Sequence, residues 1–233
     1  MHSVLYISSV VMALFCFVST GICEDMVRVP SSGNETTGYQ GCSFMNMSCA
    51  KSDVKAVKVK AFYMDVHEVT YQQLVSAGIT GLNHTDKVNE PYQVSYLVAY
   101  QYCEAVGKRL PTEAEWLAAA MPNGIQNYTW GDNYIPTAAA QTLLIDTNKH
   151  YDVMSFATDY INGIYDLSGS GCEWINTGNP TDDISKCNEQ GFTTYKTYHF
   201  CLGAAPLPLY QQIHPVINDV IVAKASFRCV KDE

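Results

Sequence analysis

Residues 107–116, Gly-Lys-Arg-Leu-Pro-Thr-Glu-Ala-Glu-Trp, constrain the fold most strongly, because they predict the end of one helix and the start of another. Gly107 suits the left-handed backbone conformation that closes a helix, and Pro111 prevents that helix from continuing. Thr112 and Glu115 have the spacing of a capping box, in which a hydroxyl and a carboxylate satisfy free amides of the next helix. We therefore expect a helix before Gly107, a corner, and a second helix that begins near Thr112.

The chain before this corner predicts a strand and two further short helices. Residues 56–63 alternate apolar with polar side chains, as a strand with one buried face does. Thr70 is followed three residues later by a glutamine, which repeats the capping-box spacing, and a third capped helix is expected near Ser95. Asp65 and Glu68 lie between the strand and the first of these helices. We interpret them as turn and cap residues rather than as a catalytic pair.

The composition is that of one folded, acidic domain. Of the 233 residues, 47% are apolar and 16% are charged, so the chain has enough apolar side chains to form a sizeable core. Glycine and proline are spread thinly and the sequence has no visible repeat or linker, which predicts a single domain over residues 24–233. The net charge of -9 disfavours binding to the phosphate backbone of a nucleic acid.

Residues 1–23 predict a secretory signal peptide. They contain an apolar run and then small residues, and the charged residues Glu24 and Asp25 follow. The alternatives are an uncleaved signal anchor and a lipoprotein attached through Cys23. No later segment is apolar for long enough to span a bilayer. We therefore expect a protein that is secreted or lies in the lumen of the secretory pathway, with no membrane span after signal removal.

Export permits disulfide bonds, and the chain has nine cysteines. Cys42 and Cys49 bracket six residues and are candidates for a local bridge. The cysteines and histidines have no spacing that is typical of a zinc site. Four Asn-x-Ser/Thr sequons are candidate glycosylation sites, at Asn34, Asn46, Asn83 and Asn127.

Three segments together resemble one known protein family. They are residues 107–116 as quoted above, Tyr-Thr-Trp-Gly-Asp at residues 128–132, and Gly-Ile-Tyr-Asp-Leu-Ser-Gly-Ser-Gly-Cys-Glu-Trp at residues 163–174. With these motifs the chain resembles the formylglycine-generating enzyme family, also called the sulfatase-modifying factor family. The resemblance implies an α+β fold, an elaborated C-type-lectin-like fold with much irregular structure.

The resemblance also implies a calcium site. In the family, one site uses main-chain carbonyls and a glutamate from the last of these segments. The matching positions here are the carbonyls of Ser168, Gly169 and Gly171 and the carboxylate of Glu173. Hard oxygen ligands of this kind suit calcium. The alternative is that Glu173 only caps or hydrogen-bonds a turn.

A disulfide bond is implied in the same way. Family members bond the cysteines that match Cys103 and Cys229, which ties the end of the chain to the helix before the 107–116 corner. Cys16 lies inside the candidate signal peptide and Cys23 at its edge, so three cysteines, Cys172, Cys187 and Cys201, remain beside the candidate pair named above. They permit one more bridge and one free thiol, and the sequence does not choose among them.

The resemblance fails in the segment that carries the family's oxidase chemistry. Oxidase members hold copper(I) between two cysteines five residues apart, because soft thiolates suit that ion. Cys201 lies near the first position, but residue 206 is a proline, and a single thiol does not reproduce the site. We therefore interpret Cys201 as a disulfide partner or a buried thiol rather than a nucleophile, and we do not expect copper. The basic segment of the family is also missing, because no arginine lies between Arg109 and Arg228.

The function that we expect is a binding or interaction module of this fold without oxidase activity, whose ligand is a protein, a peptide or a glycan. The first alternative is a formylglycine-generating oxidase that acts on a sulfatase cysteine with copper and oxygen. The second is a different chemistry on the same fold, such as that of a non-haem iron oxidase. That chemistry requires clustered histidine and carboxylate ligands, whereas the six histidines are scattered along the sequence.

Overall fold

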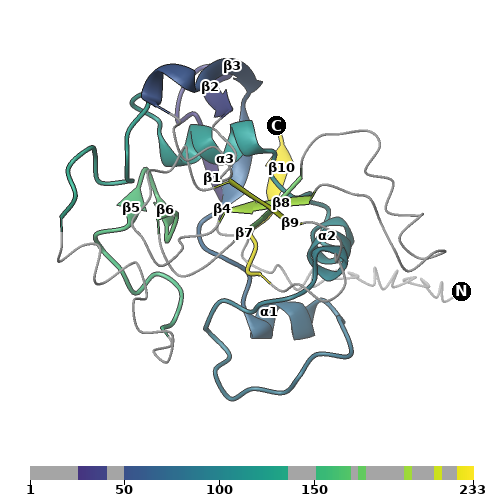
Figure 1. Ribbon diagram of the computed structural model, residues 1–233. Coiled ribbons are helices and arrows are strands. Elements are labelled where there is room, and N and C mark those ends of the chain that lie inside the picture. The colour runs from purple at the N-terminus through teal and green to yellow at the C-terminus, as the bar shows by residue number, and fades with distance from the viewer. Residues whose placement is uncertain are drawn as a thin grey trace, which may run out of the picture.

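Short helices and small antiparallel sheets make up the α+β structure of this protein (Figure 1). The computed structural model describes residues 26–40, 50–135, 151–168, 173–176, 197–200, 213–216 and 225–233. Its strands are β1 (Met26–Val29), β2 (Glu35–Gln40), β3 (Lys55–Lys60), β4 (Phe62–Asp65), β5 (Tyr160–Ile161), β6 (Ile164–Tyr165), β7 (Glu173–Ile175), β8 (Thr197–Phe200), β9 (Ile213–Val216) and β10 (Val230–Asp232). Its helices are η1 (Lys51–Asp53, a 3-10 helix), α1 (Tyr71–Ser76), α2 (Tyr96–Ala105) and α3 (Glu113–Ala120). None of the described helices has the length and apolar character that a membrane crossing requires.

One sheet brings the last residues of the chain into contact with strands from its first third. The strand order is β1-β4-β10, and β4 pairs antiparallel with both of its neighbours. Met64 lies in the middle strand, opposite Val27 on one side and Val230 on the other. Figure 1 shows β10, at the C-terminus, beside β4. The last strand is therefore part of the sheet, and Val230 in it is buried in the core, whereas Lys231 to Glu233 are exposed.

The strand expected over residues 56–63 is divided between two sheets. β3 pairs with β2, whereas β4 pairs with β1 and β10. Ala61 lies between β3 and β4, and its amide donates to the carbonyl of Asn34 at 2.9 Å. Apolar and polar residues alternate only as far as Ala61, and the adjacent residues Ala61 and Phe62 are both buried, so the alternation shifts by one residue where the chain changes partner.

The three capped helices begin where the sequence predicts. Thr70, Ser95 and Thr112 are the N-caps of α1, α2 and α3, and each side-chain oxygen accepts a backbone amide of its helix. The capping boxes at Thr70 and Thr112 are both complete, with the glutamine or glutamate side chain returning to the cap amide. After α2, Gly107 has a φ of 73°, which is the left-handed conformation expected at a helix end.

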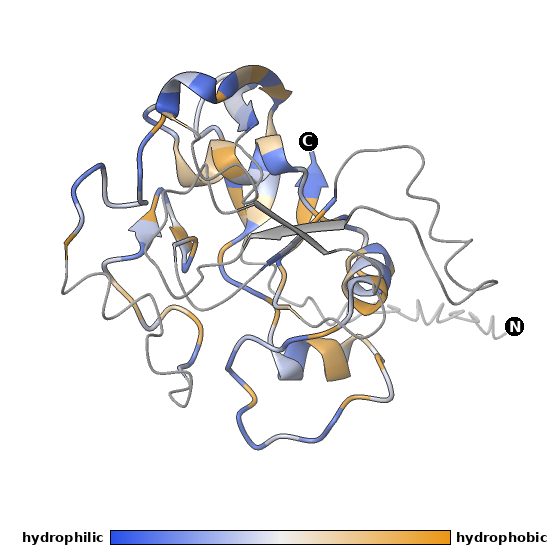
Figure 2. Ribbon diagram, in the orientation of Figure 1, coloured by the Kyte–Doolittle hydropathy of each residue, from blue (hydrophilic) through white to orange (hydrophobic). Residues whose placement is uncertain are grey.

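Two groups of buried side chains form the core. The first packs α3, through Trp116 and Leu117, against β1, β2, β3 and β4. The second packs α1 and α2 against Trp174 and Phe227. Figure 2 shows hydrophobic residues on all three of these helices, as this packing requires. The segment around residues 225–230 contributes to both groups, so it joins the two halves of the core.

A disulfide bond between Cys103 and Cys229 links α2 to the end of the chain. The Cα atoms are 5.7 Å apart and the two cysteines are separated by 126 residues in the sequence. Both side chains are fully buried. The structure thus contains the bridge that the family resemblance implies.

Candidate functional site

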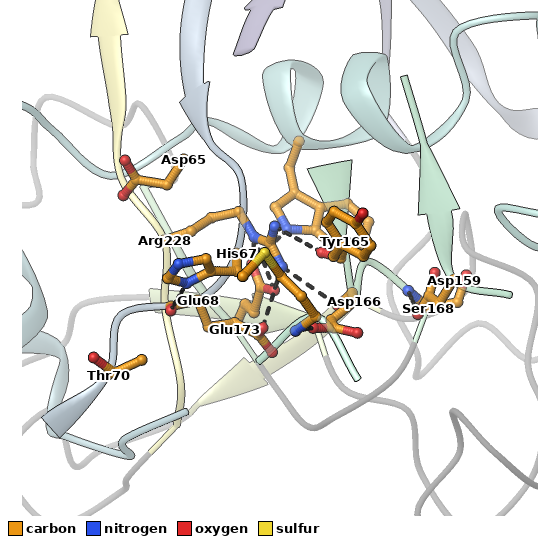
Figure 3. Close-up of polar contacts among 12 residues, drawn as sticks. Asp65, His67, Glu68, Thr70, Asp159, Tyr165, Asp166, Ser168, Glu173 and Arg228 are labelled. Atoms are coloured by element: carbon orange, nitrogen blue, oxygen red, sulfur yellow. Dashed lines mark hydrogen bonds and ion pairs between the residues drawn. The ribbon is translucent and has the colours of Figure 1, made fainter. Parts of the chain in front are cut away.

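A buried ionic network surrounds Arg228. This side chain has no exposed surface (0%), and it follows Phe227 in an apolar segment of the core. Its guanidinium donates to both carboxylate oxygens of Glu173, with N···O distances from 2.6 to 3.0 Å. Figure 3 shows the two side chains facing each other, with Asp166 and Tyr165 beside them.

Local backbone pairing explains why these two residues meet. Glu173 begins β7, and its main chain pairs in parallel with Ser226. The amide of Trp174 donates to the carbonyl of Ser226 at 2.9 Å. Arg228 follows Ser226 by two residues, which brings it close to the start of β7. The carboxylate and the guanidinium are therefore brought together across a short stretch of paired backbone.

Four other groups complete the network around this pair. The guanidinium donates to the carbonyl oxygens of Tyr165 at 3.0 Å and Asp166 at 3.3 Å. A carboxylate oxygen of Glu68 lies 3.6 Å from it. The indole N–H of Trp116 donates to Glu173 at 2.8 Å. The network consequently connects α3, β6, β7, the link between β4 and α1, and the C-terminal segment.

The charges of the network favour a permanently ionised arginine. Burial disfavours the charged guanidinium, but attraction by the carboxylates of Glu173, Glu68 and Asp166 outweighs it and raises the pKa of Arg228 above its usual range. A buried charge of this kind is tolerated only when it is paired and hydrogen-bonded. The guanidinium of Arg228 is therefore placed as a structural counter-ion for the surrounding carboxylates.

Asp159 forms a second buried polar group, beyond Asp166. One carboxylate oxygen accepts the hydroxyl of Thr129 at 2.6 Å, and the other accepts the amide of Ser168 at 2.7 Å. Burial raises the pKa of Asp159 to about 7, the two hydrogen bonds oppose that change, and the nearby Asp166 adds to it. Asp159 therefore changes protonation near neutral pH while it holds two separate loops together.

One carboxylate oxygen of Asp166 accepts a hydrogen bond and the other does not. Its Oδ2 accepts the amide of Met154 at 2.7 Å, whereas its buried Oδ1 has no hydrogen-bond partner within the residues that the structure describes. Burial raises the pKa of Asp166, and the bond from Met154 and the charge of Arg228 partly oppose that change. Sequence analysis gave no signal for this side chain beyond its place in a family motif.

Asp65 and Glu68 are ion-pair residues, and the interpretation of them as turn and cap residues is wrong. Asp65 is the last residue of β4 and pairs with Lys108 at 2.8 Å. Its second carboxylate oxygen accepts the amide of Cys229 at 2.8 Å. Burial raises the pKa of Asp65, and Lys108 opposes that change. The partners lie far away in the sequence, so local spacing did not reveal them.

The expected calcium ligands are only partly within the described residues. Glu173 and Ser168 are described and buried, whereas Gly169 and Gly171 lie outside the described residues. The carboxylate of Glu173 receives three contacts from Arg228 and one from Trp116, which occupy its acceptor positions. In this arrangement Glu173 does not fit a calcium ligand, because a cation would have to displace one of these donors. Calcium remains a prediction, and melting the protein in calcium and in EGTA tests it.

Other predicted sites have no described position. Cys42, Cys49, Cys201 and the sequon at Asn46 lie outside the described residues, as do Cys172 and Cys187. Within the described part of the chain, no group of three or more histidine, cysteine, aspartate or glutamate side chains is placed to hold a metal ion.

Sequence reasoning noted Arg228 only as the next arginine after Arg109 and did not predict its role. A signal was nevertheless present. The chain has three arginines, and this one lies between Phe227 and Cys229 in an apolar stretch. An arginine in such a position predicts a buried ion pair, although it does not identify the carboxylate.

The family model described as the sulfatase-modifying factor enzyme 1-like domain matches residues 18–190. The chain therefore belongs to the family that includes the formylglycine-generating enzymes. The match includes the 107–116 corner, the Trp130 motif and Glu173.

Two curated relatives match parts of the chain. The serine/threonine-protein kinase pkn1 of Chlamydia pneumoniae is 30% identical over 149 residues, which cover 52% of this chain and 23% of the relative. The formylglycine-generating enzyme of Mycobacterium tuberculosis is 44% identical over 52 residues, which cover 22% of this chain and 17% of the relative. The chain thus spans less than a quarter of the length of either relative.

Two solved structures share the fold. The crystal structure of CarF has a TM-score of 0.55 and 18% identity, and the similarity covers 90% of this chain and 98% of CarF. PvdO from Pseudomonas aeruginosa has a TM-score of 0.57 and 16% identity, with 89% and 94% covered. At this level of identity the similarity concerns the fold alone, and it confirms the expected fold class.

Proposed function

We propose that this chain is a binding or interaction module of the sulfatase-modifying factor family and that it has no oxidase activity. Its place of action is outside the cell or in the lumen of the secretory pathway, because residues 1–23 have the pattern of a signal peptide. Its ligand is a protein, a peptide or a glycan.

The observation that carries the proposal is the loss of one member of the family's cysteine pair. Two-coordinate copper(I) requires two thiolates, and this chain has Cys201 with Pro206 at the second position. A proline side chain offers no ligand atom. The single remaining thiol is also available for a disulfide bond with Cys172 or Cys187.

The chemistry of the buried polar groups supports a structural role for this part of the domain. Arg228 and Glu173 neutralise each other, and the carboxylate of Asp65 pairs with Lys108. The side chains of Arg228 and Glu173 are buried, and those of Lys108 and Asp65 are only 9% and 13% exposed, so a substrate would have little of either pair to contact. A domain that keeps the family's framework intact while lacking its reactive pair is suited to recognition.

One relative favours the alternative function. The relative from Mycobacterium tuberculosis is a formylglycine-generating enzyme, and it shares 44% identity over 52 residues with this chain. An oxidase that acts on a sulfatase cysteine with copper and oxygen therefore remains the competing proposal.

An activity assay distinguishes the proposed binding module from the competing oxidase. Purified protein, reconstituted with copper(I) in the presence of oxygen, is incubated with a peptide that carries the cysteine modified in sulfatases. Mass spectrometry then measures conversion of cysteine to formylglycine. We expect no conversion above that of Cys201→Ser, whereas turnover that this substitution abolishes would establish the oxidase.

A further inference from the structure

We propose that the protein carries N-linked glycans at Asn34 and Asn83, and that Asn127 is a structural residue which the folded protein keeps free of glycan. The proposal rests on the export proposed above, since sequons are modified only in chains that enter a glycosylating secretory pathway. It is independent of whether the domain is an oxidase.

A glycan is bulky and hydrated, so the asparagine that bears it must project from the surface of the folded protein. The carboxamide nitrogen must also point into solvent rather than donate to the protein. Three of the four sequons lie in described residues, at Asn34, Asn83 and Asn127, and these requirements distinguish them.

Asn83 meets both requirements. It is exposed in the irregular segment between α1 and α2. The hydroxyl of Tyr92 donates to the main-chain carbonyl of Asn83 at 2.8 Å, which anchors the backbone and leaves the side chain outside. Within the residues that the structure describes, the Asn83 carboxamide has no hydrogen-bond partner.

Asn34 has the same character. It is exposed at the end of a polar bend that precedes β2, and residues 31–33 next to it are exposed as well. Its carbonyl accepts the amide of Ala61 at 2.9 Å, so here too the main chain is fixed. Among the described residues, no hydrogen-bond partner contacts its carboxamide.

Asn127 differs because its side chain closes a turn. Its Nδ2 donates to the carbonyl of Asp132 at 2.9 Å, and its amide donates to a carboxylate oxygen of Asp132 at 3.0 Å. Tyr128 is buried and stacks on Trp130, with ring centroids 4.9 Å apart. A glycan on this nitrogen would compete with the bond that holds the turn.

The third residue of the same sequon lies in the core. Thr129 is only 6% exposed, and its hydroxyl donates to Asp159 at 2.6 Å and accepts from the hydroxyl of Ser168 at 2.8 Å. The Thr129 amide donates to Ser168 at 3.0 Å. These bonds join three separate segments. In the folded protein the third residue of the Asn127 sequon is therefore inaccessible.

The test uses the full chain in a glycosylating cell line, with the leader of a known secreted protein in place of residues 1–23. An Asn46→Gln background removes the sequon that is outside the described residues. Secreted protein is treated with a glycosidase in heavy-oxygen water, and peptide mass spectrometry reads the occupancy of each asparagine. Asn34→Gln, Asn83→Gln and Asn127→Gln are compared by gel mobility.

We expect two glycans per chain, on Asn34 and Asn83. Asn34→Gln and Asn83→Gln then each lose one glycan, whereas Asn127→Gln loses none. A glycan on Asn127 in secreted protein with its Cys103–Cys229 bond intact would overturn the proposal, and so would an unmodified Asn34 or Asn83. A parallel sample with the native residues 1–23 tests export separately, so failure of the localisation is not confused with failure of the glycan assignment.

Discussion

Arg228 is a charged residue that is fully buried in the core. A charge without exposed surface must be matched nearby, and Glu173 matches it through three hydrogen bonds. Removing one partner of a buried ion pair is more damaging than removing both, because the other charge remains buried and uncompensated.

Glu173→Gln should therefore destabilise the protein strongly. The neutral amide leaves the guanidinium without its closest counter-charge, so we expect a loss of about 3–5 kcal/mol in the free energy of unfolding. Urea denaturation measures it. Glu35→Gln is the matched control, because Glu35 pairs with Lys58 at the surface and its loss should change stability by less than about 1 kcal/mol. Equal effects of the two substitutions would contradict the assigned role of Glu173.

The protonation of Asp159 gives a prediction for pH. Burial raises the pKa of Asp159 from its ordinary value of 3.8 to about 7, so between these pH values the folded state holds a proton that the unfolded state releases. This contribution to stability is complete below pH 3.8 and is lost as the pH rises through about 7. Asp159→Asn cannot titrate. The fall in melting temperature between pH 5 and pH 8 should thus be smaller in this variant than in the wild type, and parallel pH profiles would contradict the prediction.

Among the elements, α3 depends most clearly on local chemistry. Thr112 accepts the amide of Glu115 at 3.3 Å, and the carboxylate of Glu115 accepts the amide of Thr112 at 2.8 Å. The same carboxylate also pairs with Arg109. The cap thus holds the corner between α2 and α3 as well as the helix end.

Thr112→Ala should lower the free energy of unfolding by about 1 kcal/mol, because the cap oxygen is lost. Thr112→Ser keeps a hydroxyl in the same place and should remain close to the wild type. Thermal unfolding of the three proteins checks the prediction. An unchanged melting temperature in Thr112→Ala would show that the cap contributes nothing.

The sequence predicted those elements that depend on short-range spacing. The caps at Thr70, Ser95 and Thr112 were confirmed because a cap and the amide that it satisfies lie within one helical turn. The break between β3 and β4 was not predicted: the alternation shifts at Ala61 and Phe62, but the change of partner strand is a long-range property. Alternation of side chains indicates a strand but not the sheet to which it belongs.

Across the whole molecule, the C-terminal segment holds the fold together. β10 pairs with β4, Cys229 is bonded to Cys103, and Arg228 joins the buried network. The disulfide was expected only through the family resemblance. The partners of Arg228 were not predicted, because residues 55 positions apart in the sequence meet only through the fold.

Removing the disulfide bond should have a large effect. The bond closes a loop across a separation of 126 residues, for which the loop-entropy relation gives roughly 4–5 kcal/mol. The double variant Cys103→Ala/Cys229→Ala should unfold at correspondingly lower urea concentration. Peptide mapping of the wild type without reductant should recover the two cysteines linked. Finding either one free would contradict the pairing.

The central claim is that this member of the family has lost the copper site of the oxidases. A titration of the folded protein with copper(I), in competition with a chromophoric chelator and without oxygen, measures this most directly. The account predicts that the wild type and Cys201→Ser compete equally weakly, because one thiol with Pro206 at the second position does not form the two-coordinate site. One tightly bound copper per wild-type chain, absent from Cys201→Ser, would contradict it.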